Sequence, residues 1–188
     1  SVHLTAGFFR ITGANLVVFK GGVTVDGGGD IFLEGNEINF QTGETAVIGT
    51  GILSLRPTNV GLGIEVGGPP LENAAMLNID NAEIATFAST FSKIVIGRQE
   101  GATSGYLAGA HADDLAGAVR IGAIQTPQQY TFRSALEVYG GSIVVEDFAN
   151  PAYQFLVNGN LKLDAWNGIS IYNQVEAHNS NIALYAQT

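Results

Sequence analysis

Short apolar segments that alternate with polar positions run through the whole chain, each bounded by Gly, Asn, Asp or Ser. A turn residue followed by an aliphatic residue, any residue and a second aliphatic residue recurs, which is typical of short strands that start at a turn. The copies recur irregularly, at intervals of roughly 20 residues, a repeat length typical of stacked coils. The pattern predicts an all-β protein, a β-solenoid, in a single domain over residues 1–188. A β-sandwich, which needs longer strands and hairpin turns, stays open as an alternative. The copies begin at Asn15, Asp30, Ser142, Asn160, Gly168 and Asn181.

The two aliphatic residues of each copy are expected to face the interior, because side chains alternate across a strand. About nine coils of roughly 20 residues are expected, which gives a body roughly 40–45 Å long. The residues expected to point inward are Leu16, Val18, Ile31, Leu33, Ile143, Val145, Leu161, Leu163, Ile169, Ile171, Ile182 and Leu184.

One segment has a different period. Residues 81–91 place apolar side chains at positions 84, 87, 88 and 91, which is helical spacing. Asp80 or Asn81 can serve as the N-cap. We therefore expect one short helix or helical turn on the flank of the solenoid, covering apolar surface.

Composition and charge exclude several classes of protein. Charged residues make up 13% of the chain, which carries 25 glycines and a net charge of −9. The eight basic residues are scattered, so binding to nucleic acid or to an anionic membrane is not expected. The absence of cysteine excludes disulfides and thiolate chemistry. No segment is long enough for a transmembrane helix. The chain begins at Ser1 without a signal-peptide pattern, so we expect a processed piece or excerpt of a longer product.

Four sequence blocks resemble a repeat of very large bacterial exoproteins similar to filamentous haemagglutinin. They are residues 49–57, 63–68, 77–87 and 91–98, and the last combines Ile-x-Ile with Gly-Arg. Glycine-plus-aliphatic runs further along, at residues 140–145, 160–164 and 181–186, look like the coils of the same proteins. The resemblance covers most of residues 22–188. It implies a right-handed parallel β-helix, export to the cell surface, and adhesion or matrix building.

A single glycine-rich turn, residues 26–30, resembles a calcium-binding nonapeptide, with Asp26 and Asp30 as the candidate metal ligands. Such sites need tandem copies, because successive turns share each ion. Only one copy is present, so a glycine-rich corner is the favoured interpretation and no cofactor is expected.

Two sets of residues could carry enzyme chemistry. His111 with Asp113 and Asp114 could suggest a metal or a general base, but a solvated loop is the better interpretation. Parallel β-helix enzymes cleave polysaccharides with clustered carboxylates on adjacent coils. Nothing in the sequence fixes a pair at catalytic separation, so an enzyme is not expected. The carboxylate candidates are Asp26, Asp30, Glu34, Glu37, Glu44 and Glu65.

The two ends of the chain are strand-like and apolar. Val2 and Leu4 near the start, and Ile182 and Leu184 near the end, are expected to pair with flanking coils of a parent chain or with another copy. The expected function is an extracellular structural or adhesive scaffold, secreted, on the cell surface or in the matrix. A surface carbohydrate or a protein receptor would be its other partner. A self-assembling fibre subunit and a carbohydrate-active β-helix enzyme are the alternatives.

Overall fold

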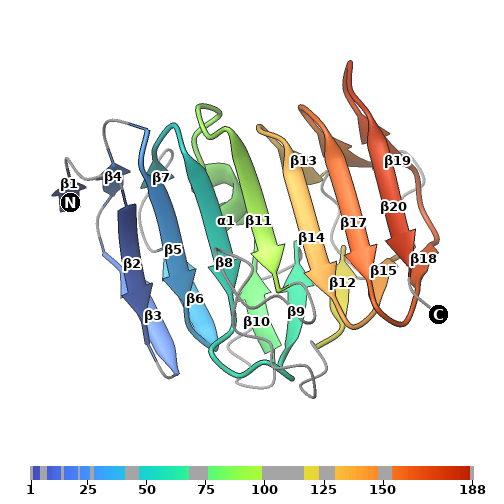
Figure 1. Ribbon diagram of the computed structural model, residues 1–188, viewed down its shortest axis with the longest axis horizontal. Helices are drawn as coiled ribbons and strands as arrows, with labels where there is room; N and C mark the ends of the chain where they lie inside the picture. The colour runs from blue at the N-terminus through green and yellow to red at the C-terminus, as the bar shows by residue number, and fades with distance from the viewer. Residues whose placement is uncertain are drawn as a thin grey trace.

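The structure is a computed structural model of the chain. It describes residues 2–4, 8–13, 15–20, 22–25, 28–40, 47–67, 76–98, 117–122, 130–147 and 154–186, with the backbone alone for residues 2–4, 8 and 130. Strands stack side by side from the N-terminal coil at the left of Figure 1 to the C-terminal coil at the right. All the strand pairings among the described residues are parallel, and the protein is a β-solenoid.

The longest sheet holds seven strands in parallel register. Seven strands at about 4.8 Å span roughly 29 Å, so the expectation of nine coils was too high. The cause is that two intervals along the chain between successive strands of this sheet are long. One of them separates the paired residues Leu53 and Ile94, which are 41 positions apart. In order the strands are β2 (Phe8–Thr12), β5 (Asp30–Glu34), β8 (Ile52–Arg56), β11 (Lys93–Gly97), β14 (Leu136–Gly140), β17 (Leu161–Ala165) and β20 (Ile182–Ala186).

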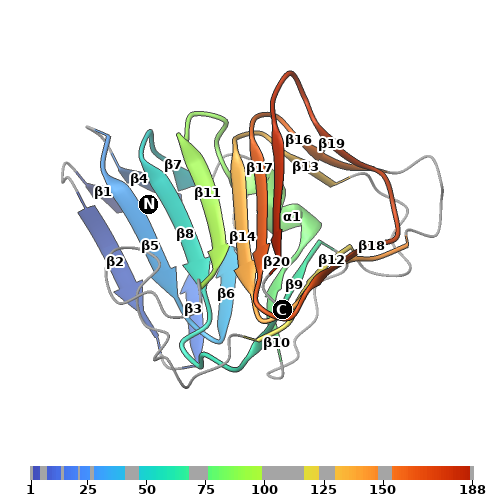
Figure 2. The same ribbon diagram turned by 45° about the vertical axis from the view of Figure 1, so that its right-hand side comes forward.

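Shorter strands form the other two faces (Figure 2). One face contains β1 (Val2–Leu4), β4 (Val23–Val25) and β7 (Val47–Ile48), then β13 (Tyr130–Phe132), β16 (Phe155–Val157) and β19 (Val175–Ala177). The other contains β3 (Leu16–Phe19) and β6 (Glu37–Phe40), then β10 (Met76–Ile79), β9 (Gly63–Val66), β12 (Val119–Ile121), β15 (Ile143–Val145) and β18 (Ile169–Ile171).

Strand β10 is out of order. It follows β9 along the chain, yet it pairs on the side of β9 that faces away from β12 and lies next to β6. The Asn78 N–H donates to Glu37 Oε2 of β6 at 3.4 Å. After β9 the chain therefore turns back toward the N-terminal coils, and β10 lies between β9 and β6 on this face.

The expected helix is present as α1 (Asn81–Thr86) and is shorter than the segment that predicted it. Asp80 caps it by accepting from the Glu83 N–H at 2.8 Å, and Glu83 accepts from the Asp80 N–H at 2.9 Å, which completes a capping box. Glu83 also accepts from the Phe40 N–H of β6 at 3.1 Å. The helix ends at Thr86 because Phe87 is extended and bridges to Val47. Helix α1 therefore fills a level of the face formed by β7 and β13.

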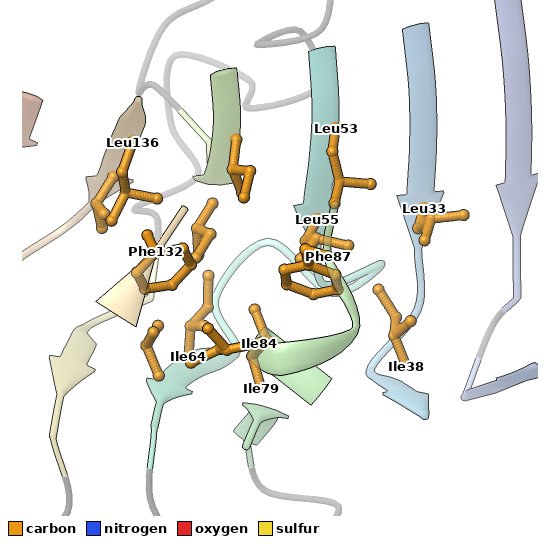
Figure 3. Close-up of a cluster of buried hydrophobic side chains, with 14 of the residues drawn as sticks. Leu33, Ile38, Leu53, Leu55, Ile64, Ile79, Ile84, Phe87, Phe132 and Leu136 are labelled. Atoms are coloured by element: carbon orange, nitrogen blue, oxygen red, sulfur yellow. The ribbon is translucent and has the colours of Figure 1, made fainter. Parts of the chain in front are cut away.

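The interior is a continuous apolar column (Figure 3). Ile31, Leu33, Ile143, Val145, Leu161 and Leu163 are buried as predicted. Phe19 stacks on Phe40 with ring centroids 5.1 Å apart, and Phe87 meets Phe40 edge-on at 5.4 Å. The apolar positions 84, 87, 88 and 91 are buried too, so the helix and the turn after it belong to the core.

The predicted direction of β3 was wrong. Leu16 is 56% exposed and Val18 36%, while Val17 and Phe19 are buried. All four residues of β3 are apolar, so its own alternation carries no information on which side faces in. The pairing with β6 fixes which side of β3 faces the interior, because the polar Glu37 pairs with Leu16 and the buried Ile38 pairs with Val17.

The predicted burial also fails in the last coil. Ile171, Ile182 and Leu184 are exposed and Ile169 is only partly buried. Their register is that of the core, since Ile182 pairs with Leu161 and Leu184 with Leu163. The residues therefore occupy the inward row, but no described coil covers them. In addition, no helix among the described residues is long and apolar enough to cross a membrane.

Burial raises the pKa of Glu83 to about 8, against the opposing effect of its hydrogen bonds from Asp80 and Phe40. The folded state therefore holds a proton that the unfolded chain releases, because the ordinary pKa of a glutamate is 4.5. Stability should fall as the pH rises from about 4.5 to about 8. We expect Glu83→Gln to flatten this slope in urea unfolding measured across that range. Glu176→Gln, at a partly exposed carboxylate of β19, is the control, and an unchanged slope in Glu83→Gln would contradict the assignment.

Candidate functional site

The candidate calcium ligands do not form a described site. Asp26 lies outside the described residues, and Asp30 Oδ1 accepts a hydrogen bond from the Ile52 N–H at 2.8 Å. Asp30 therefore joins the start of β5 to the start of β8. In the part of the chain that the structure describes, no group of three or more His, Cys, Asp or Glu side chains could hold a metal ion.

The carboxylates proposed for catalysis are dispersed. Asp26 and Glu44 lie outside the described residues, and Glu37 binds the backbone of β10. Glu65 is buried on β9, and this burial raises its pKa; Arg120 opposes the rise and Glu146 adds to it. Arg120 Nε donates to Glu146 Oε1 at 2.8 Å. Glu65 and Glu146 are therefore close enough to influence each other electrostatically, on a different sheet from Glu34.

Glu34 is the centre of an ion cluster whose members are buried apart from the half-exposed Arg10. It accepts from Arg10 Nη2 at 2.8 Å, Arg56 Nη2 at 3.2 Å and Arg98 Nη2 at 2.7 Å. Burial alone would raise the pKa of Glu34, but the three guanidinium groups outweigh it and lower the pKa. The four side chains come from β2, β5, β8 and the residue after β11. The cluster therefore ties four coils together on the outside of the long sheet.

The candidates His111, Asp113 and Asp114, and the other histidines and the tyrosines of the chain, are placed only in part. His111, Asp113 and Asp114, with Tyr106 and Tyr153, lie outside the described residues, as do the side chains of His3 and Tyr130. His178 is exposed, with Nδ1 3.5 Å from Glu176 Oε1. Tyr172 and Tyr185 are 65% and 54% exposed. These two tyrosines are the described ones that face solvent, as a binding surface requires.

A groove of about 340 Å³ crosses the outer face of the long sheet. Its lining comes from the starts of β11, β14, β17 and β20, so it runs along the solenoid axis. Glu137, Lys162 and Ala183 are adjacent outward positions in register on three of these strands. The other lining residues are Ser92, Lys93, Ala135, Leu136, Asn160, Leu161 and Asn181.

The charged groups of the groove are paired with one another. Lys93 Nζ lies 2.8 Å from Glu137 Oε1, and Lys162 Nζ lies 2.9 Å from Asp164 Oδ2. The hydroxyl of Tyr139 donates to Glu137 Oε2 at 2.9 Å and accepts from Lys162 Nζ at 3.2 Å. The Lys162 ammonium also lies 5.0 Å from the ring centroid of Tyr185. The network therefore holds two positive and two negative side chains and fixes each of them in place.

Two groups at the groove, Tyr139 and Lys162, are poorly suited to proton abstraction. Burial raises the pKa of Tyr139 to about 12. Burial would lower the pKa of Lys162, but its bonds to Asp164 and Tyr139 raise it. Both groups therefore keep their protons at neutral pH, whereas a general base needs a pKa near the working pH.

The second feature is the uncovered end of the C-terminal coil. Strands β18, β19 and β20 each lie at the edge of their sheets, and β1, β2 and β3 lie at the opposite edges. On the C-terminal edge, Leu184 is 50% exposed, while Leu163 in the same inward row is fully buried. Val2 and Leu4 fall on edge strand β1, and Ile182 and Leu184 on edge strand β20, where the sequence analysis expected them.

Sequence reasoning missed the groove because its residues come from coils of unequal length. Glu137 and Lys93 are 44 positions apart, whereas Asn181 and Asn160 are 21 apart. Lys162, a polar residue between two aliphatic residues, was the available signal, because it marks an outward position. Without the register of four strands, that signal does not show which outward residues meet.

Comparison with known proteins gives no relative. No family model matches the sequence, and neither a curated protein nor a solved structure matches it. The resemblance to the repeats of large bacterial exoproteins therefore stays a prediction.

Gly97 allows β11 to end where Arg98 can reach Glu34. Its φ is +85°, and a Cβ there would strike the Tyr139 carbonyl oxygen of β14. Gly168, with φ +126°, has open space around it. A non-glycine residue with positive φ costs about 1–3 kcal/mol. We therefore expect Gly168→Ala to lower the free energy of unfolding by about that amount. Gly97→Ala should lower the free energy of unfolding, measured with urea, by clearly more than Gly168→Ala does. Equal losses in the two variants would contradict the close approach of the Tyr139 carbonyl to Gly97.

Proposed function

We propose that the protein is an extracellular structural and adhesive scaffold, and not an enzyme, whose solenoid continues end to end. The observation that carries this proposal is the exposed inward row of the last coil. Ile182 is 44% exposed, whereas Leu161, its partner one coil earlier, is 1% exposed. Complete burial of an exposed aliphatic side chain of this size is worth roughly 1.5–3 kcal/mol, and covering the half-exposed Ile182 would supply a part of that. A further coil stacked on this end would therefore be favourable.

The opposite end offers a matching surface. Strands β20 and β2 are both five residues long, and β19 and β1 are both three residues long. Phe9 and Ile11 of β2 pair with Ile31 and Leu33, so they occupy the same inward rows. A second copy placed on the C-terminal coil would extend all three faces with parallel strands. This contact joins surfaces at opposite ends of the solenoid axis, so each added copy presents the same surface again and the copies form a filament along that axis.

Flanking coils of a longer chain would cover the same surfaces in the same way. In both arrangements the protein contributes a stretch of a continuous rod. The extracellular setting is supported by the resemblance of most of residues 22–188 to exoprotein repeats. The fixed protons of Tyr139 and Lys162, together with the dispersed carboxylates, favour a scaffold over a catalyst.

End-to-end association is tested with Ile182→Lys/Leu184→Lys. The two ammonium groups would lie on the inward row, where a stacked coil would have to bury them at a cost of several kcal/mol each. We expect the unmodified chain to form particles larger than one chain in light scattering, and the variant to stay monomeric.

The matched control is Ser170→Lys/Tyr185→Lys, which adds the same charge at outward positions of β18 and β20. It should assemble as the unmodified chain does. Circular dichroism of all three proteins checks that the coils are intact. A monomeric unmodified chain, or assembly that survives the inward lysines, would refute end-to-end pairing.

A further inference from the structure

The groove on the long sheet has the chemistry of a ligand site. We propose that it binds an extended, uncharged glycan chain that lies along the solenoid axis. This inference names the ligand of the adhesive part of the proposed function and rests on that part alone. End-to-end stacking concerns different surfaces, because the groove is lateral.

The shape of the groove requires an extended ligand. Four successive strands line it, at a spacing of about 4.8 Å, so the lined stretch is about 14 Å long. Three of the four coils contribute equivalent positions, one before the strand and one on its outward side, such as Asn160 and Lys162 of β17 or Asn181 and Ala183 of β20. The remaining coil contributes Ser92 and Lys93, at the start of β11. A polymer with one unit per coil therefore meets the same two positions at three successive steps, and a sugar residue in an extended glycan is nearly as long as the spacing of about 4.8 Å between coils.

The electrostatics of the groove favour a neutral ligand. The ammonium groups of Lys93 and Lys162 already bind Glu137 and Asp164. An anion would have to break these pairs and would approach a protein with a net charge of −9. A polyanion therefore gains little here, and a polycation would have to displace the paired lysines.

The lining presents what hydroxyl groups and sugar rings bind. Asn160 and Asn181 are exposed amides at adjacent levels, which both donate and accept hydrogen bonds. Ala135 and Ala183 leave apolar floor between the polar side chains. The ring of Tyr185, on the outward side of β20 two residues beyond Ala183, is 54% exposed and is held by the Lys162 ammonium. A flat apolar ring beside fixed donors and acceptors matches a sugar, which has an apolar face and a polar rim.

Binding is tested by titrating the protein with neutral linear hexasaccharides of β-1,4-linked glucose, mannose and N-acetylglucosamine, and with hexagalacturonate as the acidic comparison. Isothermal calorimetry at up to millimolar ligand gives the affinities. We expect at least one neutral hexasaccharide to bind and hexagalacturonate to bind more weakly. Ala183→Trp, which fills the groove, should weaken the neutral ligand by at least about tenfold. Asn181→Ala should weaken it by a smaller factor.

Ser170→Trp is the matched control, because it adds the same ring at an exposed outward position of the same coil on another face. It should bind as the unmodified protein does. The inference is overturned if no neutral hexasaccharide binds, if hexagalacturonate binds best, or if Ala183→Trp and Ser170→Trp bind alike. Light scattering of the same variants separates a failure of glycan binding from a failure of end-to-end assembly. A variant that loses glycan binding but assembles normally has a defect in the groove alone.

Discussion

Every coil of this protein depends on a neighbour on each side to complete the burial of its inward side chains. The parallel strands of the long sheet supply backbone hydrogen bonds along the axis, and the aliphatic rows between them supply the apolar contacts. Leu163, with a coil on both sides, is fully buried, and Leu184, with one, is half exposed. The same residue type in the same row therefore has a different environment solely because of its position along the stack. This dependence on nearest neighbours is the general property of solenoids.

The outer surface of the long sheet adds lateral interactions that differ along the axis. Toward the N-terminal coils, Glu34 binds the buried Arg56 and Arg98 and the half-exposed Arg10. Breaking such a cluster by removing one partner leaves an uncompensated buried charge, which is strongly destabilising. Toward the C-terminal coils, Lys93, Glu137, Lys162 and Asp164 form pairs that stay partly exposed at the groove. One sheet thus has a closed, structural half and an open half that a ligand can reach.

The fold class could be predicted from the sequence because each aliphatic-any-aliphatic copy corresponds to one short strand. Ile31 and Leu33, or Leu161 and Leu163, alternate with residues that include charged ones, so their direction was correct. Leu16 and Val18 were placed wrongly because β3 has no polar position to fix its direction. The exposure of Ile182 depends on what stacks above it, and the Glu34 cluster and the groove depend on register between strands 21 to 64 positions apart. None of these is a local property of the chain.

The displaced strand β10 has a consequence for the order in which the coils can form. In a solenoid whose spatial order follows the chain, each new coil can add to a finished edge. Here the neighbour of β9 on the β6 side is β10, which comes later in the chain. The edge that β6 presents is therefore completed only after β9 has been made and the chain has returned, and Glu83 of the following helix then binds the Phe40 N–H of β6. Assembly by successive addition is therefore interrupted at this level, because β6, β10 and α1 complete their contacts only after β9 is in place.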